Sequence, residues 1–356
     1  MSFLVSATDA GGAANVASVA ALLPQSQRHV YCTQATERYF HSYGIYDLTR
    51  WETAPTPAEV MDDVQPQAVL CGTAGYPSQD RALLREAQRH KAATVAILDE
   101  WYRYIERFLD PDDSEPYFPT VLCVPDDLAR AEAAAAGIPE ETMVVTGSPA
   151  LAAVCDRVEG YEHTIPALPD IRPGTPRPWI VFLSETHAAG YSAHPGQRGP
   201  LGPFLGYTEW CVAADIVKAL ADIASPCTLI EKRHPSDTSP LRALSLAPGQ
   251  AWRSVGRLAL GPLLWHADLV VGMRSVALIE SALCGRPTLS FQPGLLPPHQ
   301  PSTAERVGLV ESARSAADLI AWLRRNWHRS SCRRPVRPAF AAHDAAARVH
   351  DILLRA

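Results

Sequence analysis

Short apolar runs alternate along the chain with stretches in which apolar residues recur every three or four positions. In the first half, the short runs predict strands and the periodic stretches predict helices between them. The strands lie at 3–6, 29–32, 68–71, 94–98, 120–124 and 143–146, and the helices at 13–23, 35–43, 79–90 and 126–136. Strands that alternate with helices are typical of a parallel sheet with helical crossovers. The first half therefore predicts one complete Rossmann-like sheet.

The alternation stops at a proline-rich stretch and then starts again. Residues 159–178 contain five prolines and little apolar periodicity, as expected of a linker. Beyond it, strands are predicted at 179–184, 227–232, 268–272 and 288–291, and helices at 208–223, 258–265, 274–284, 315–327 and 339–354. We therefore predict an α/β protein with two Rossmann-like domains whose parallel sheets face a cleft between them. The domains span 1–160 and 179–335, with a linker at 161–178 and a C-terminal helix at 336–356.

Composition narrows the choice of partners. Nearly half of the 356 residues are apolar, and the net charge of -6 comes with no basic stripe. This pattern argues against nucleic acid and against an anionic membrane surface as partners. No apolar run reaches the roughly 20 residues that cross a bilayer, and the first residues do not resemble a secretory signal. We therefore expect a cytoplasmic protein without a transmembrane segment, and its oligomeric state stays open.

Neither the cysteines nor the acidic residues indicate a metal site. The eight cysteines lack any CxxC or Cys/His pair at ligand spacing, and several lie inside apolar runs. Buried free thiols are therefore expected at Cys32, Cys71, Cys123, Cys155, Cys211, Cys227, Cys284 and Cys332. No dense aspartate cluster suited to Mg²⁺ is present. We expect neither a metal nor a cofactor.

Candidate chemistry begins directly after the first predicted strand. In open α/β sheets, ligands bind beyond the carboxyl ends of the strands. Asp9, Gly11 and Gly12 form a small-residue turn there, which can bring backbone N–H groups and a helix N-terminus close to a ligand on the acceptor side of a cleft. A tight strand-to-helix turn without a ligand accounts for the same residues equally well.

A second candidate follows the strand at 94–98. Asp99 and Glu100 stand at its carboxyl end, where Asp99 could take a proton from an acceptor hydroxyl as a general base. The alternative is that Asp99 caps a helix that carries Trp101 and Tyr104. On such a helix, Arg107 would form an ordinary surface pair at three- or four-residue spacing.

In the second half, basic groups meet a proline at the end of a strand. His234 could donate to a nucleotide phosphate oxygen and stabilise the leaving nucleotide, with Lys232 adding a point charge. The alternative is a surface strand end with a solvated histidine.

Further along, Arg274 and Ser275 begin a predicted helix that would aim Ser275 and free N–H groups at an anion. Glu280 could then reach a ribose or sugar hydroxyl, or it could be an ordinary carboxylate on the helix surface.

The start of the second domain supplies two more candidates. Ser184 and Glu185 lie at the end of the strand at 179–184, where we expect them to bind the donor sugar or base. The loop at 186–206, rich in glycine and proline, is long enough to be a functional insertion or a mobile lid.

These residues carry a resemblance. KRHP at 232–235, followed by GMRSVALIESALCGRPTLSFQPG at 272–294, resembles the paired HP and Ser/Thr motifs of bacterial CMP-sugar enzymes of the GT-B superfamily, among them sialyltransferases and polysialyltransferases. The resemblance implies that His234 and Ser275 contact the phosphate of a cytidine nucleotide and that Asp99 is the base. More distantly, VTGSP at 145–149 resembles a VTGN-type segment of UDP-N-acetylglucosamine 2-epimerases.

The chain departs from the pattern of each family at one place. Trp101 follows Asp99 and Glu100 where the sialyltransferases have glycine, and Ser275-Val276-Ala277 replaces the Ser-Gly-Gly of the epimerases. We therefore expect a glycosyltransferase that moves a sugar from a nucleotide-sugar donor to a hydroxyl acceptor, and the resemblance implies CMP as the nucleotide. The alternatives are a nucleotide-sugar 2-epimerase or hydrolase, and a non-catalytic module that binds a nucleotide or glycan.

Overall fold

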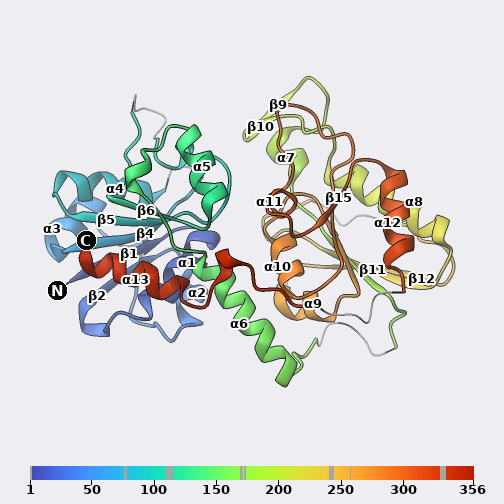
Figure 1. Ribbon diagram of the computed structural model, residues 1–356, viewed down its shortest axis with the longest axis horizontal. Helices are drawn as coiled ribbons and strands as arrows, with labels where there is room; N and C mark the ends of the chain where they lie inside the picture. Colours follow the sequence, from blue (N-terminus) through green and yellow to red (C-terminus); the bar gives the residue numbers. More distant parts are fainter. Residues whose placement is uncertain are drawn as a thin grey trace. The chain divides into compact units, whose positions relative to one another are not determined.

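The computed structural model describes residues 2–75, 78–109, 115–168, 171, 174–239, 244–256, 258–328 and 334–356. The chain forms two compact units (Figure 1). The first consists of Met1–Asp156 and Arg337–Ala356, and the second of Arg157–Val336. Each unit contains one parallel sheet with its own core.

The first unit is built on seven parallel strands in the order β3-β2-β1-β4-β5-β6-β7. They are β1 (Phe3–Ala7), β2 (Arg28–Cys32), β3 (Thr49–Arg50), β4 (Ala68–Gly72), β5 (Ala93–Ile97), β6 (Val121–Val124) and β7 (Met143–Val145). The six predicted strands are confirmed. Only β3 was missed, because two exposed residues leave no apolar pattern.

Helices cover both faces of this sheet. They are α1 (Ala10–Ala20), α2 (Glu37–His41), α3 (Pro57–Val64), α4 (Gln79–Arg89), α5 (Asp127–Ala135), the start of α6 (Pro149–His163) and α13 (Ala345–Arg355). Phe3 and Val5 of β1 pack in one core with residues of α1 and α13, whereas Leu4 packs with residues of α3 and α4 on the other face. Burial on both faces explains why the strands read as continuous apolar runs.

The second unit holds six parallel strands in the order β12-β11-β8-β13-β14-β15. They are β8 (Trp179–Leu183), β11 (Cys227–Lys232), β12 (Gln250–Val255), β13 (Leu269–Gly272), β14 (Thr288–Phe291) and β15 (Glu311–Ala313). The four inner strands were predicted, and the two edge strands were not. A small antiparallel hairpin, β9 (Arg198–Gly199) and β10 (Gly202–Pro203), lies within the long loop.

The helices of the second unit are α7 (His187–Tyr191), α8 (Glu209–Ile223), α9 (Leu260–His266), α10 (Ala277–Leu283), α11 (Thr303–Arg306) and α12 (Ala316–Asn326). Phe182 of β8 lies in a core that α8 and α12 cover with Ile216 and Trp322. The predicted helix at 274–284 is shorter in the structure, so Arg274 and Ser275 lie in the turn that precedes α10.

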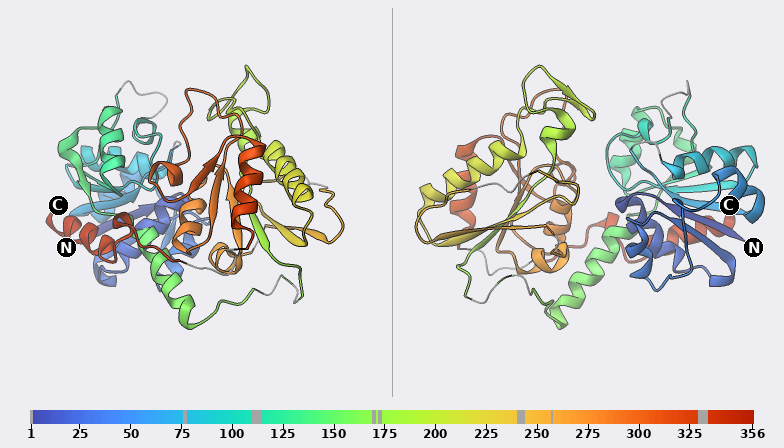
Figure 2. Two further views of the ribbon diagram at one scale, coloured as in Figure 1. Left: turned by 45° about the vertical axis from the view of Figure 1, so that its right-hand side comes forward. Right: turned by 180° about the vertical axis from the view of Figure 1, so that it is seen from behind.

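The chain ends both belong to the first unit, as two further views show (Figure 2). Helix α13 confirms most of the predicted C-terminal helix, which begins instead with a 3₁₀ turn, Ala339–Ala341. Helix α6 extends to His163 and so occupies the start of the stretch predicted as a linker, in which Pro169 and Pro173 lie outside the described residues.

Three further expectations concern the helix after Asp99, the cysteines and membrane-spanning helices. Residues 99–104 are not helical, in contrast to the helix considered for Trp101 and Tyr104, and only a 3₁₀ turn follows, Ile105–Arg107. Six cysteines are buried and outside any disulfide, whereas Cys211 is exposed and Cys332 lies outside the described residues. In the described part of the chain, no helix is both long and apolar enough to cross a bilayer.

Candidate functional site

In the first unit, the candidate residues follow three neighbouring strands. Asp9 comes after β1, Thr73 after β4 and Asp99 after β5. The strand order reverses between β1 and β4, and ligands of open α/β sheets bind at such a switch point. The structure therefore places Asp9 and Asp99 at the carboxyl edge of the sheet, as expected from the sequence.

Asp99 is held by a buried arginine. Arg107 Nη1 lies 2.5 Å from Asp99 Oδ1, and its side chain is only 3% exposed. The same nitrogen donates to the carbonyl oxygen and to the hydroxyl of Thr73. Two expectations are thus corrected: Arg107 is not a surface residue, and Asp99 does not cap a helix, because the residues directly after it are not helical.

The two glycines of the first turn make room for these carboxyl groups. A Cβ atom at Gly11 would lie 2.1 Å from Asp99 Oδ2, and one at Gly12 would lie 3.1 Å from the Cα of Gly72. Asp9 caps α1, since its Oδ1 accepts from the N–H of Gly12 at 2.6 Å. Glycine at these two positions therefore allows α1 to approach both the end of β4 and the carboxyl group of Asp99 closely.

The protonation of Asp9 differs from that of an ordinary aspartate. Burial, followed by the negative charge of Asp99, raises the pKa of Asp9 to about 8, although the hydrogen bond from Gly12 opposes this shift. The site thus holds a carboxyl group that keeps its proton at neutral pH beside one that is paired with Arg107. Such a pair can donate and accept a proton.

Sequence reasoning missed Asp80, whose negative charge contributes to the raised pKa of Asp9. Its carboxylate accepts from the hydroxyls of Ser6 and Thr8 and from the N–H of Thr8. Burial raises the pKa of Asp80, against these three hydrogen bonds. Its position at the start of α4, ahead of an ordinary amphipathic pattern, gave no signal.

Glu100 lies next to Asp99, and its negative charge also raises the pKa of Arg107.

In the second unit, Glu185 stands at the centre of the candidate residues. It follows β8, and its Oε1 accepts from the backbone N–H groups of Arg274 (2.7 Å) and Ser275 (3.1 Å), which follow β13. Its Oε2 lies 2.9 Å from His187 Nε2. The N–H groups that were predicted to face a phosphate therefore bind a carboxylate of the chain. The hydroxyl of Ser275 accepts from the N–H of Ala277.

Glu185 is strongly anionic. Burial alone would raise its pKa, but the charge and hydrogen bond of His187, together with the two N–H groups, lower the pKa of Glu185 to about 2. His187 is itself 6% exposed and packs edge-on against the rings of Tyr191 and Tyr207. The sequence offered one signal for His187, its position two residues after Glu185 at a strand end.

Two cationic or potentially cationic side chains each have a buried nitrogen atom that forms no hydrogen bond in the described part of the chain. Within the described residues, Nδ1 of His187 and Nη1 of Arg274 have no hydrogen-bond partner. The Arg274 guanidinium also lies 5.8 Å from the ring centroid of Tyr191. Buried polar atoms normally find partners, so each of these two atoms can still form a hydrogen bond with a ligand or water.

The KRHP segment forms a compact turn beyond β11. His234 is exposed, and its Nδ1 accepts from the N–H of Ser236, which leaves the proton of the neutral ring on Nε2. Loss of solvent around the ring lowers the pKa of His234, although Glu185 and Asp237 oppose this shift. An Nε2–H donor suits a phosphate oxygen. The Nζ of Lys232, in contrast, donates to the carbonyl of Gly256.

The remaining candidates are placed as follows. Ser184 is buried directly after β8, and its N–H donates to the carbonyl of Lys232. Glu280 lies on α10, where burial raises its pKa against the charge of Arg157.

The loop at 186–206 packs tightly. A Cβ atom at Gly199 would lie 2.4 Å from the carbonyl oxygen of Gly190, and one at Gly206 would lie 2.0 Å from that of Gly294. The segment therefore contains α7 and a hairpin, with close backbone approaches at Gly199 and Gly206.

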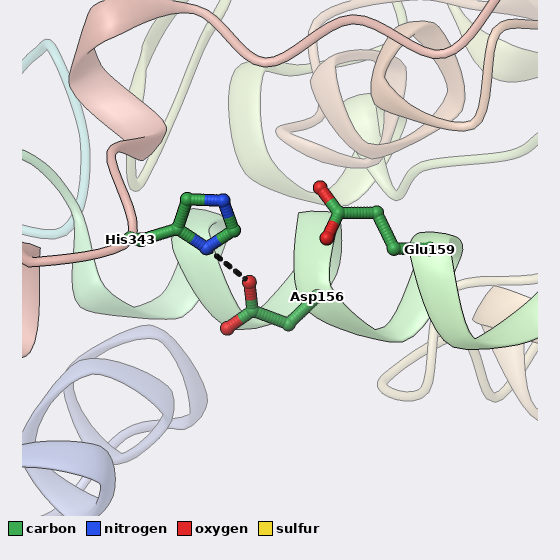
Figure 3. Close-up of side chains that lie close together, drawn as sticks. All are labelled: Asp156, Glu159 and His343. Atoms are coloured by element: carbon green, nitrogen blue, oxygen red, sulfur yellow. Dashed lines mark hydrogen bonds and ion pairs between the residues drawn. The ribbon is translucent and has the colours of Figure 1, made fainter.

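A surface cluster elsewhere superficially resembles a metal site. Asp156 and Glu159 lie one turn apart on α6, and Asp156 approaches His343 (Figure 3). Asp156 Oδ1 already contacts Arg337 at 2.7 Å and His343 at 3.0 Å. Because Asp156, Glu159 and His343 are all exposed, we interpret this cluster as a surface ion-pair group.

Several solved structures of UDP-N-acetylglucosamine 2-epimerases share this fold. The enzyme from Neisseria meningitidis bound to UDP-GlcNAc has a TM-score of 0.66, with 12% identity over 100% of both chains. The Methanocaldococcus jannaschii enzyme in complex with UDP-GlcNAc and UDP has a TM-score of 0.64, again with 12% identity over 100% of both chains. MurG from Acinetobacter baumannii has a TM-score of 0.52 with the same identity and coverage.

No protein-family model and no curated protein sequence matches the chain. The similarity to the solved structures shows a GT-B-like fold of two Rossmann-like units. That part of the prediction is confirmed.

Proposed function

We propose that this protein is an enzyme that epimerises or hydrolyses a UDP-linked sugar. The observation that carries the proposal is the similarity of the whole chain, both units included, to UDP-N-acetylglucosamine 2-epimerases, one of them bound to UDP-GlcNAc and another to UDP-GlcNAc and UDP. This changes the order of the two functions expected from the sequence, in which a transferase came first.

The chemistry of the first unit is consistent with this proposal. Epimerisation at a carbon requires that a proton leave from one face and return to the other, and hydrolysis requires that a water lose a proton. Asp9 keeps its proton at neutral pH, while Asp99 is paired with Arg107. We assign the proton transfers to Asp9 and Asp99, with Gly11, Gly12 and Glu100 shaping their surroundings.

The second unit would hold the nucleotide. His234 presents an Nε2–H donor, and Arg274 and Lys232 supply positive charge. Arg274 and Ser275 follow β13 near the switch point of the second sheet, between β8 and β13. Glu280 would contact a ribose hydroxyl, and Ser184 and Glu185 would lie close to the sugar or phosphate. None of these roles needs a metal or a cofactor.

The test is to incubate the protein with UDP-GlcNAc alone in D₂O and follow the sugar by proton NMR. We expect either a second 2-acetamido sugar that carries deuterium at the epimerised carbon, or free sugar together with UDP. Asp99→Asn should abolish either product. Asp126→Asn is the matched control, because Asp126 caps α5 in the same unit and asparagine caps equally well. Unchanged UDP-GlcNAc at high enzyme concentration would reject the proposal for this substrate.

A second candidate is transfer of a sugar to a hydroxyl acceptor, with a CMP- or UDP-linked donor. It is favoured by the similarity to MurG and by the KRHP and Ser275 motifs. Thermal stabilisation by CMP, CDP, UMP and UDP separates the two candidates, because a ligand that binds only the folded protein raises its stability. Selective stabilisation by CMP or CDP that is lost in His234→Ala would favour the transferase. Selective stabilisation by UDP would favour the epimerase.

A further inference from the structure

The groups of the second unit that are best suited to an anion are already bound to one. Glu185 uses both carboxylate oxygens: one accepts from the N–H groups of Arg274 and Ser275, and the other contacts His187. Glu185 is distant in sequence from Arg274 and Ser275, so these contacts join the ends of β8 and β13 across the switch point of the sheet. An internal carboxylate therefore stands where strand ends of this fold receive their ligand.

One carboxylate does not satisfy this set of donors. Nη1 of Arg274, which can only donate, is buried without a partner in the described structure, and so is Nδ1 of His187, which donates when both ring nitrogens carry a proton. The other ring nitrogen of His187 contacts Glu185. A phosphate group offers more acceptor oxygens than a carboxylate and could engage donors that Glu185 leaves unused. These groups can therefore form more hydrogen bonds to an anion than they form with the carboxylate of Glu185.

We propose that Glu185 is an internal competitor, whose carboxylate must leave the N–H groups of Arg274 and Ser275 before the phosphate of a substrate can bind there. The inference rests on the proposed function only in its choice of a nucleotide as substrate, since any phosphate anion would meet the same competitor. Two anions cannot share these donors, because like charges at contact distance repel strongly in a site largely removed from solvent.

Removing the charge of Glu185 should therefore tighten phosphate binding. If Glu185 instead binds the donor sugar, the opposite effect is expected, because loss of its carboxylate would weaken binding of the donor.

The test measures binding of pyrophosphate and of UDP by calorimetry to the wild-type chain, Glu185→Ala and Glu185→Gln. We expect at least tenfold tighter binding of pyrophosphate to Glu185→Ala. A smaller gain is expected for Glu185→Gln, which keeps an acceptor oxygen but loses the charge. If the alanine variant does not fold, the glutamine variant decides the sign.

Asp268→Asn is the matched control. Asp268 lies where β13 begins, at the opposite edge of the same sheet, and its carboxylate likewise binds a backbone N–H, that of Trp179, and a cation, Arg177. Its loss removes the same charge and the same kind of contact, so binding of both ligands should stay at the wild-type level.

The two ligands separate this inference from the proposed function. Tighter binding of pyrophosphate without any binding of UDP would support the internal competitor and reject the nucleotide site. Equal or weaker binding of pyrophosphate in both Glu185 variants would overturn the inference, whatever the result with UDP. A gain of the same size in Asp268→Asn would also overturn it, because the effect would then reflect net charge alone.

Discussion

At the scale of single residues, Asp9 is subject to opposing influences. Its hydrogen bond from Gly12 favours the ionised form, as in any helix cap, whereas burial and the charges of Asp99 and Asp80 favour the protonated form. The raised pKa shows that the second set is stronger. Asp9 therefore combines a structural contact with the proton affinity of a general acid near neutral pH.

This protonation predicts a pH-dependent stability. Between an unfolded pKa near 4 and the folded value of about 8, the folded state binds a proton that the unfolded state lacks, so stability falls as the pH rises and levels off above pH 8. Asp9→Asn keeps a capping side chain but cannot titrate. We expect its stability relative to wild type to increase by at least about 1 kcal/mol from pH 5 to pH 8, measured by urea unfolding of the first unit. Parallel pH profiles of the two proteins would contradict the shift.

Arg107 yields a second prediction at this scale. Its buried guanidinium binds Asp99, two oxygen atoms of Thr73 and the carbonyl of Tyr102. Arg107→Met would leave Asp99 without its cation and should cost about 3–5 kcal/mol in the free energy of unfolding, while Arg107→Lys should cost less. Arg89→Met is the control, because Arg89 forms an exposed pair with Glu86 and should change stability by less than about 1 kcal/mol. Similar losses in both methionine variants would mean that Arg107 is not a buried clamp.

At the scale of elements, the loop at 186–206 depends on backbone approaches that only glycine allows. Gly206 and Gly196 both have a positive φ, of 103° and 75°. A Cβ atom at Gly206 would collide with the carbonyl of Gly294, whereas one at Gly196 would meet nothing within 4 Å. Gly196→Ala should thus cost only the conformational strain, about 1 kcal/mol, and Gly206→Ala clearly more. Equal losses in chemical denaturation would indicate that the backbone around Gly294 yields freely.

The sequence predicts strands well where both faces are buried and less well at the edges of the sheets, where β7 was predicted but β3, β12 and β15 were missed. β8, WIVFL, reads as a continuous apolar run, whereas β12 mixes Arg253 and Ser254 with apolar residues because it lies at the edge of its sheet. The end of each apolar run also marks the end of a strand. This placed four candidate residues at the carboxyl edges of the sheets: Asp9, Asp99, Glu185 and Ser275. The contact of Glu185 with the turn after β13 could not be predicted, because it joins segments about 90 residues apart.

At the scale of the whole molecule, the chain leaves the first unit, forms the second and returns. Helix α13 lies against α1, and its buried residues Val349 and Leu353 share the core of β1 and β2. The first unit is therefore completed only by the last residues of the chain, while the second unit is continuous in sequence. Damage to α13 should destabilise one unit and leave the other unchanged.

Two adjacent leucines test this arrangement. Leu353 is fully buried, whereas Leu354 is 41% exposed on the same helix. Leu353→Ala should lower the free energy of unfolding of the first unit by about 2–5 kcal/mol, because it removes apolar contacts and leaves a cavity, whereas Leu354→Ala should change it by less than about 0.5 kcal/mol. Calorimetry can follow the two units if they unfold separately, and proteolysis can assign each transition. A loss confined to the first unit would mean that α13 is part of its core. An equal loss in both units would mean that they unfold together, because destabilising one then lowers the stability of the whole molecule.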